Sequence, residues 1–206
     1  MFSFVEDYPQ KTSIMLSFLN SWFRKITGNK RFNYDYNSVY FKYADFGLYE
    51  EFCAHSENYI HVQNEIHFLE DVSFTSTSKE LRKTLGKPVT VVNLTNKPKT
   101  EIYLYKTIRD GEKQKLLFHF FQDKILMVSR VFPYATNTKI LELQNRFLTK
   151  FNLAELDEKQ DRISIQDNNK QHLFLISDVE YTEHFMKFDK QFKDFVSLKF
   201  KETSLL

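Results

Sequence analysis

The residue whose surroundings best suit chemistry is His119, which lies within an aromatic strand-like run, residues 115–121. An imidazole titrates near neutral pH and can therefore bind or move a proton. A neighbouring run, residues 101–107, carries Tyr103 and Tyr105, which share the face of His119 in one register of the two strands. One imidazole and two phenols in an aromatic pocket could bind a small ligand, so these three residues are the candidate ligand-binding set. The alternative, which the pattern favours, is a core histidine hydrogen-bonded to a tyrosine hydroxyl.

Two other pairs of reactive side chains occur close together in the sequence. His61 and His67 flank one predicted turn, but a metal site needs three or four ligands in a defined geometry. Cys53 and His55 have the types of a nucleophile and its base, yet a separation of two residues does not itself create the required hydrogen bond. The chain contains no P-loop, dinucleotide-binding fingerprint or Gly-x-Ser-x-Gly motif. We therefore predict no catalytic residue, no metal site and no cofactor.

Composition limits the classes of partner. The 206-residue chain contains 22 Phe and 11 Tyr but only 4 Gly, and its 29 basic and 27 acidic residues leave a formal net charge of +2. Aromatic side chains are efficient core formers, whereas this even charge balance lacks the concentrated basic face typical of nucleic-acid-binding proteins. We therefore expect a protein partner or a small apolar ligand, and no nucleic acid.

The expected location follows from three further features. No apolar run approaches the roughly 20 residues that a membrane span requires. The sequence opens without the basic start and small-residue cleavage site of a secretory signal. Cys53 is the only cysteine, so no internal disulfide can form. Together these features predict a cytoplasmic protein without a membrane span.

The elements that position these residues are organised around a short helix, predicted at residues 77–85. Thr77 and Glu80 have the spacing of a capping box, and Gly86 stands where a helix would end. The runs that follow the helix alternate like strands and are joined by connections of hairpin length: residues 101–107, 115–121 and 125–131. We therefore predict a capped helix followed by an antiparallel meander.

Apolar periodicity predicts the remaining elements. Three- and four-residue spacing indicates three more helices: residues 13–27, 138–151 and 182–196. Residue type and alternation indicate further strands: residues 39–43, 59–62, 66–69, 162–166 and 170–176. Asp45-Phe46-Gly47 is a predicted break, and two loops are expected, at residues 73–78 and 93–99. At the end of the chain, residues 192–200 are an alternative strand.

The predicted fold class is α+β, an antiparallel sheet of meander hairpins packed with amphipathic helices. We expect a single domain over residues 1–206, with a subdivision into 1–133 and 134–206 as an alternative. The order of helix, Gly86-Lys87-Pro88, strand and hairpin over residues 77–131 resembles the helix-plus-antiparallel-sheet unit of the SmpA/OmlA and beta-lactamase-inhibitor-like group. The helix and two strands predicted at 138–176 follow a similar order, which would fit two similar helix-and-sheet halves.

Three functions from different classes are consistent with these residues. The first is a non-enzymatic binding module of the inhibitor or immunity type, because aromatic residues are abundant and no catalytic motif is found. The second is an enzyme of unrecognised family with a histidine-centred pocket at His119 or at the His61/His67 pair. The third is an architectural role in a homo-oligomer. The sequence favours the binding module.

Overall fold

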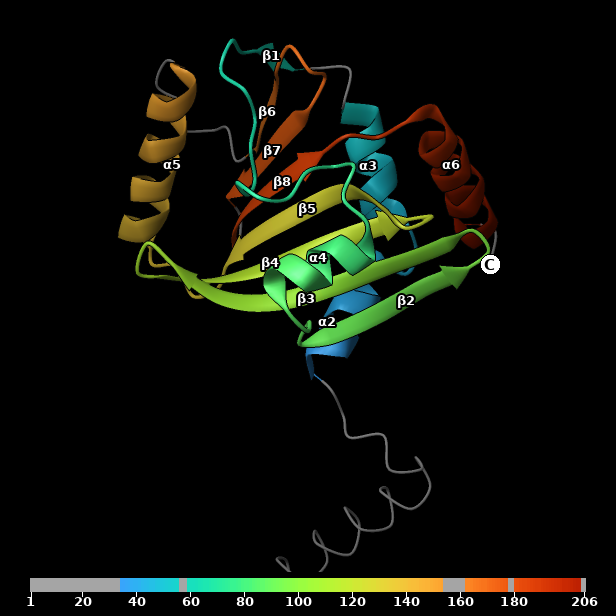
Figure 1. Ribbon diagram of the computed structural model, residues 1–206. Helices are drawn as coiled ribbons and strands as arrows, with labels where there is room; N and C mark the ends of the chain where they lie inside the picture. The colour runs from blue at the N-terminus through green and yellow to red at the C-terminus, as the bar shows by residue number, and fades with distance from the viewer. Residues whose placement is uncertain (1–33, 56–58, 154–161, 178–179, 205–206) are drawn as a thin grey trace, which may run out of the picture.

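In the part of the chain that the structure describes, one sheet of eight strands is found (Figure 1). The computed structural model describes residues 34–55, 59–153, 162–177 and 180–204, so the helix predicted at 13–27 lies outside the described residues. The strand order is β1-β6-β7-β8-β5-β4-β3-β2, in which β1 and β6 are parallel and all other neighbours are antiparallel. The strands are β1 (Ile60–His61), β2 (Thr90–Asn96), β3 (Lys99–Arg109), β4 (Glu112–Phe121), β5 (Lys124–Phe132), β6 (Arg162–Gln166), β7 (His172–Ser177) and β8 (Tyr181–Met186).

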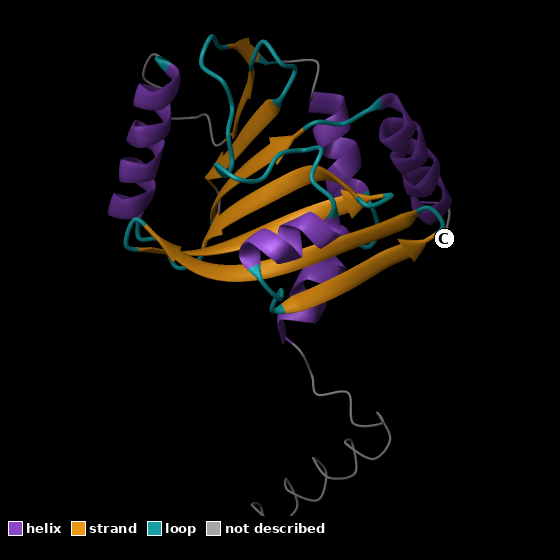
Figure 2. Ribbon diagram, in the orientation of Figure 1, coloured by secondary structure: helices purple, strands orange, loops and turns teal. Residues whose placement is uncertain are grey.

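Helices cover both faces of the sheet (Figures 1 and 2). One face, here called the α2 face, is covered by α2 (Tyr34–Tyr43), α3 (Gly47–His55) and α6 (Lys190–Ser204). The other, the α4 face, is covered by α4 (Ser78–Leu85), α5 (Asn137–Phe151) and the loop at 62–74. Each face has its own apolar core, so the central strands are buried on both sides. The predicted α+β class is confirmed.

The capping box at the start of α4 is confirmed. The Thr77 hydroxyl accepts a hydrogen bond from the Glu80 amide at 3.3 Å, and the Glu80 carboxylate accepts one from the Thr77 amide at 2.8 Å. Gly86 ends the helix with a φ of 78°, which a side chain would strain. Leu81 is fully buried and packs α4 against the sheet. Local sequence signals therefore define this helix.

The meander is also confirmed, and its first turn fixes its register. Asp110 and Gly111 both have positive φ values, 52° and 77°, as the two central residues of a type I′ turn require. This turn pairs Arg109 with Glu112 and sets every later pair of β3 and β4. The three strands predicted from alternation lie within β3, β4 and β5.

Near the start of the described chain, the strand predicted at 39–43 is wrong, and of the strands predicted at 59–62 and 66–69 only Ile60–His61 is found, as β1. Residues 39–43 belong to helix α2, where Val39 and Tyr43, one turn apart, are buried against the sheet. Burial of this helical stripe outweighs the strand propensity of the aromatic residues. Residues 59–69 form no hairpin, because the short strand β1 pairs with β6, and the Val62 amide donates to the Gln166 carbonyl at 2.9 Å. The predicted break at residues 45–47 is confirmed as the connection between α2 and α3.

Two later predictions are also wrong in part. Residues 93–96 continue β2, where a loop was expected, because Val92 is fully buried and the strand pairs with β3. The tail helix predicted at 182–196 begins only at Lys190, since residues 181–186 form β8 between β5 and β7. Both faces of β8 are buried, so its aromatic residues show no one-sided alternation.

The other predicted elements are found. The helix at 138–151 is α5, and the hairpin at 162–176 is β6 and β7. β8 pairs with β5, so strands from residues 134–206 continue the sheet formed by earlier residues. Within the described part of the chain, no helix has the length and apolar character needed to cross a bilayer.

Candidate functional site

The three predicted ligand-binding residues do not form one pocket. The register of β3 and β4 places His119 opposite Ile102, whereas Tyr103 lies opposite Phe118. Directly opposite residues of antiparallel strands share a face, so Tyr103 and Tyr105 belong to the α4 face and His119 to the α2 face. The prediction that both tyrosines share the face of His119 is therefore wrong.

Tyr103 and Tyr105 instead attach helix α4 to the sheet. The Arg82 guanidinium donates to the Tyr103 hydroxyl at 3.0 Å and lies 4.9 Å from the centre of its ring. The Tyr105 hydroxyl donates to the Gly86 carbonyl at 3.1 Å, satisfying a group at the helix end. Burial raises the pKa of Tyr105 to about 12, so this phenol stays protonated as a donor.

His119 belongs to a buried chain of polar side chains on the α2 face. Its Nδ1 is 2.7 Å from the Tyr49 hydroxyl, and its Nε2 is 3.3 Å from the Ser129 hydroxyl. Ser129 also contacts Nδ1 of His184 at 2.8 Å. All four side chains are at most 1 % exposed. The interpretation of His119 as a core histidine bonded to a tyrosine hydroxyl is confirmed.

Burial keeps both histidines of this chain neutral. It lowers the pKa of His119 well below the ordinary value, with smaller contributions from His184 and Lys42. It also lowers the pKa of His184, to about 3, with Lys42 again contributing. Neither histidine lines the surface recess at Lys115, the one at Phe192 or the one at His67. A neutral, enclosed arrangement of this kind specifies packing, because each polar atom needs its partner.

The histidines at 61 and 67 have different polar partners. His67 is 62 % exposed and lies 3.0 Å from the Glu65 carboxylate. His61 contacts the Asn168 side chain at 3.1 Å. Among residues with described positions, no three metal-ligating side chains come together.

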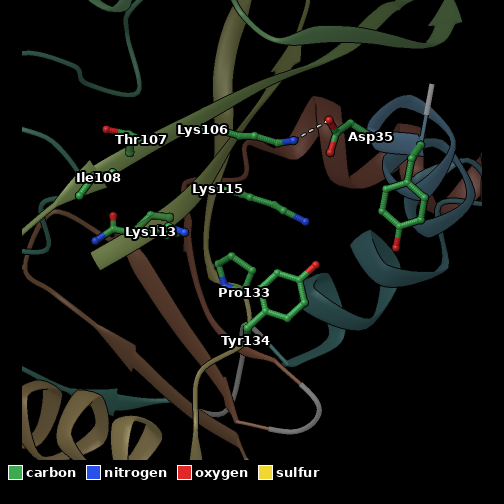
Figure 3. Close-up of a pocket in the computed structure, with 10 residues that line it drawn as sticks. Asp35, Lys106, Thr107, Ile108, Lys113, Lys115, Pro133 and Tyr134 are labelled. Atoms are coloured by element: carbon green, nitrogen blue, oxygen red, sulfur yellow. Dashed lines mark hydrogen bonds and ion pairs between the residues drawn. The ribbon is translucent and has the colours of Figure 1, made fainter. Parts of the chain in front are cut away.

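A different region, a recess on the α2 face, has the features of a binding site (Figure 3). Its volume is about 460 Å³, within the range of ligand pockets. The walls come from the start of α2, from the ends of β3 and β4 next to their shared turn, and from residues 133–134 after β5. The meander therefore positions most of the recess.

Three lysines make the recess cationic. Lys106 lies directly opposite Lys115 in the β3–β4 pairing, and Lys113 lies two residues from Lys115 on the same face. Asp35 of α2 binds the Lys106 ammonium group at 2.7 Å. Figure 3 shows the Lys115 ammonium group in the space between Asp35 and Tyr134. Within the described residues, neither Lys113 nor Lys115 forms an ion pair.

Lys42 extends the positive charge along α2. It lies seven residues, or nearly two helical turns, after Asp35 and therefore on the same side of the helix. Desolvation lowers the pKa of Lys42, and the neighbouring charge of Lys115 lowers it further, while Glu180 has the opposite effect. Lys42 thus interacts electrostatically with Glu180 and, less strongly, with Lys115, and its charge also acts on both buried histidines.

Large apolar side chains stand exposed around these lysines. Tyr34 is 70 % exposed, Ile108 is 68 % exposed and Tyr134 is 95 % exposed. Tyr134 also has a φ of 62°, a left-handed conformation that is uncommon for a residue with a side chain. We call Tyr34, Ile108, Lys113, Lys115 and Tyr134 the recess surface. In contrast to the two buried cores, the recess surface exposes aromatic and charged side chains to solvent.

The sequence contained a signal for this surface that the prediction did not use. A two-residue Asp-Gly turn sets the register of its hairpin, so Asp110-Gly111 already implies that Lys106 and Lys115 are opposite each other. No local signal placed Tyr34 or Asp35 there, because α2 reaches the recess only through tertiary packing.

Comparison with known protein families, curated proteins and solved structures finds no match to this chain.

Proposed function

We propose that the protein is a non-enzymatic binding module and that the recess surface contacts a partner protein. The observation that carries this proposal is the combination of two lysines without a described ion pair and three exposed apolar side chains around one recess. Exposed apolar groups beside charged ones are typical of interaction sites, and tyrosine is enriched among the residues that contribute most to binding.

The arrangement of the lysines supports the same proposal. Like charges directly opposite each other on neighbouring strands destabilise a sheet. Lys106 and Lys115 occupy such a pair, and Asp35 neutralises only the first of them. Tyr134 is a second unfavourable feature. Its backbone is in the left-handed conformation, and its exposed ring gains no packing that would offset the strain. Features that weaken the free protein concentrate at functional sites.

The alternative of an enzyme with a histidine-centred pocket has less support. Both ring nitrogens of His119 are hydrogen-bonded inside the core, and its lowered pKa leaves it neutral at pH 7. His67 contributes to a second cavity, of about 480 Å³, but its described ion-pair partner is the exposed Glu65.

The proposal is tested by affinity capture with three baits, quantified by mass spectrometry. The baits are the wild type, the double variant K113E/K115E and the control K83E/K87E, which changes the charge equally at exposed positions near α4. We expect a partner protein that the wild type and the control retain and that K113E/K115E loses. Equal retention of every captured protein by the three baits would argue against the recess as the contact surface.

A further inference from the structure

We propose that the segment bound by the recess is acidic, with carboxylates that contact Lys113 and Lys115 and a neighbouring apolar side chain that contacts Tyr34 and Tyr134. This inference rests on the proposed function and adds the chemistry of the partner. Its basis is the charge and shape of the recess.

The protein itself shows how a carboxylate fits in this recess. Asp35 binds Lys106 at 2.7 Å from the opposite wall. Lys115 lies beside Lys106 in the strand pairing, with its ammonium group directed into the same space. A carboxylate from a partner would therefore meet Lys115 as Asp35 meets Lys106, through a charge-assisted hydrogen bond.

The balance of charges leaves the recess cationic. Among the described residues, its walls contain three lysines and one carboxylate, that of Asp35. Neighbouring ammonium groups repel one another, so a bound carboxylate lowers the electrostatic energy of the whole cluster. Charge complementarity of this kind determines partner choice and the rate of association.

The composition of the walls favours a carboxylate-bearing peptide over a nucleic acid. Among the described residues that line the recess there is no arginine, so they do not provide the bidentate fork that matches phosphate geometry. The chain as a whole carries a formal charge of only +2, without the strong basic footprint of nucleic-acid binders.

The apolar part of the predicted segment follows from the rim. Tyr34 from α2 and Tyr134 from the segment after β5 border the same recess, and Ile108 from β3 also borders it. Two exposed rings at a recess of about 460 Å³ offer contact area for an apolar side chain. The lysines would hold the acidic neighbours of that side chain.

The inference is tested by selecting peptides from a random 12-residue phage library on immobilised wild-type protein. We expect the selected peptides to combine several Asp or Glu residues with an aromatic or aliphatic residue. Their affinity, measured by fluorescence anisotropy, should fall at least ~10-fold for K113E/K115E, which corresponds to about 1.4 kcal/mol. It should be kept by K83E/K87E and by the charge-conserving K113R/K115R, and it should fall in 0.5 M NaCl.

The outcomes separate this inference from the proposed function. Selected peptides that lack acidic residues but still need Tyr134 would overturn the acidic partner and leave the recess as a binding surface. Tighter binding of a 12-nucleotide oligo-dT than of any selected peptide, lost in K113E/K115E, would overturn it in favour of nucleic acid. Peptides that bind all variants equally would overturn both proposals.

Discussion

The buried histidines predict a loss of stability in mild acid. His119 and His184 are fully enclosed on the α2 face and share the Ser129 hydroxyl. Their pKa values are lowered in the folded protein by burial and by Lys42, to about 3 for His184. A histidine in the unfolded chain has a pKa of about 6.5. Below that pH the unfolded state binds more protons, so stability is complete above pH 6.5 and falls as the pH falls toward 3.

The size of the effect is set, for His184, by the difference between its pKa in the folded protein and in the unfolded chain. At pH 5, His184 in the unfolded chain gains about 2 kcal/mol from protonation that the folded protein, with a His184 pKa of about 3, does not gain. His184 alone should therefore lower the free energy of unfolding by roughly 2 kcal/mol between pH 7.5 and pH 5, and the lowered pKa of His119 adds to this loss; a typical domain has ~5–15 kcal/mol in total.

The assay is urea unfolding followed by far-ultraviolet circular dichroism at pH 7.5, 6 and 5. His184→Gln removes one titrating group and should reduce the loss by about 2 kcal/mol, whatever its stability at pH 7.5. His67→Gln, at a position 62 % exposed, is the control and should keep the full loss. A wild-type loss below ~1 kcal/mol, or an unchanged loss in His184→Gln, would refute the assignment of neutral buried histidines.

Three further predictions concern single residues. Tyr134→Gly should raise the free energy of unfolding by about 0.5–1 kcal/mol, because glycine accepts the left-handed φ of 62° and the exposed ring packs against little. Urea unfolding measures this gain. The same variant should bind the partner less tightly. Thr77→Ala should lower the thermal midpoint and cost about 1 kcal/mol through loss of the α4 cap, whereas Thr84→Ala, on the exposed part of that helix, should change little. Burial raises the pKa of Cys53 to about 12. The reaction of this thiol with Ellman's reagent at pH 8 should therefore be at least ~30-fold slower in the folded protein than in the urea-unfolded protein. Equal rates in the two states would contradict this prediction.

The parts of the fold that could be predicted are those with local signals. The capping box of Thr77 and Glu80 and the glycine at 86 define α4 without reference to the rest of the chain. The turn at Asp110-Gly111 likewise defines the β3–β4 hairpin. Helix α2 and strand β8 lack such signals, because their aromatic residues suit either structure and only packing on the sheet decides between them.

The candidate site was harder to predict because it depends on which face each residue occupies. His119 and Tyr103 both lie in strands that are rich in aromatic residues, and only the strand register assigns them to opposite faces of the sheet. Lys106 and Lys115 become neighbours through that same register. The contribution of α2, through Tyr34 and Asp35, comes from residues 71 or more positions before Lys106 and could not be read from spacing.

The central claim is that the recess surface is where this protein contacts its partner. Site-specific photo-cross-linking tests it most directly, with benzoylphenylalanine incorporated at position 134 or, as a control, at position 59, where Tyr59 is 42 % exposed away from the recess. We predict a cross-linked partner from position 134 that is lost when K113E/K115E is added, and none from position 59. Cross-linking from position 59 alone, or cross-linking from position 134 that survives the charge reversal, would contradict the claim.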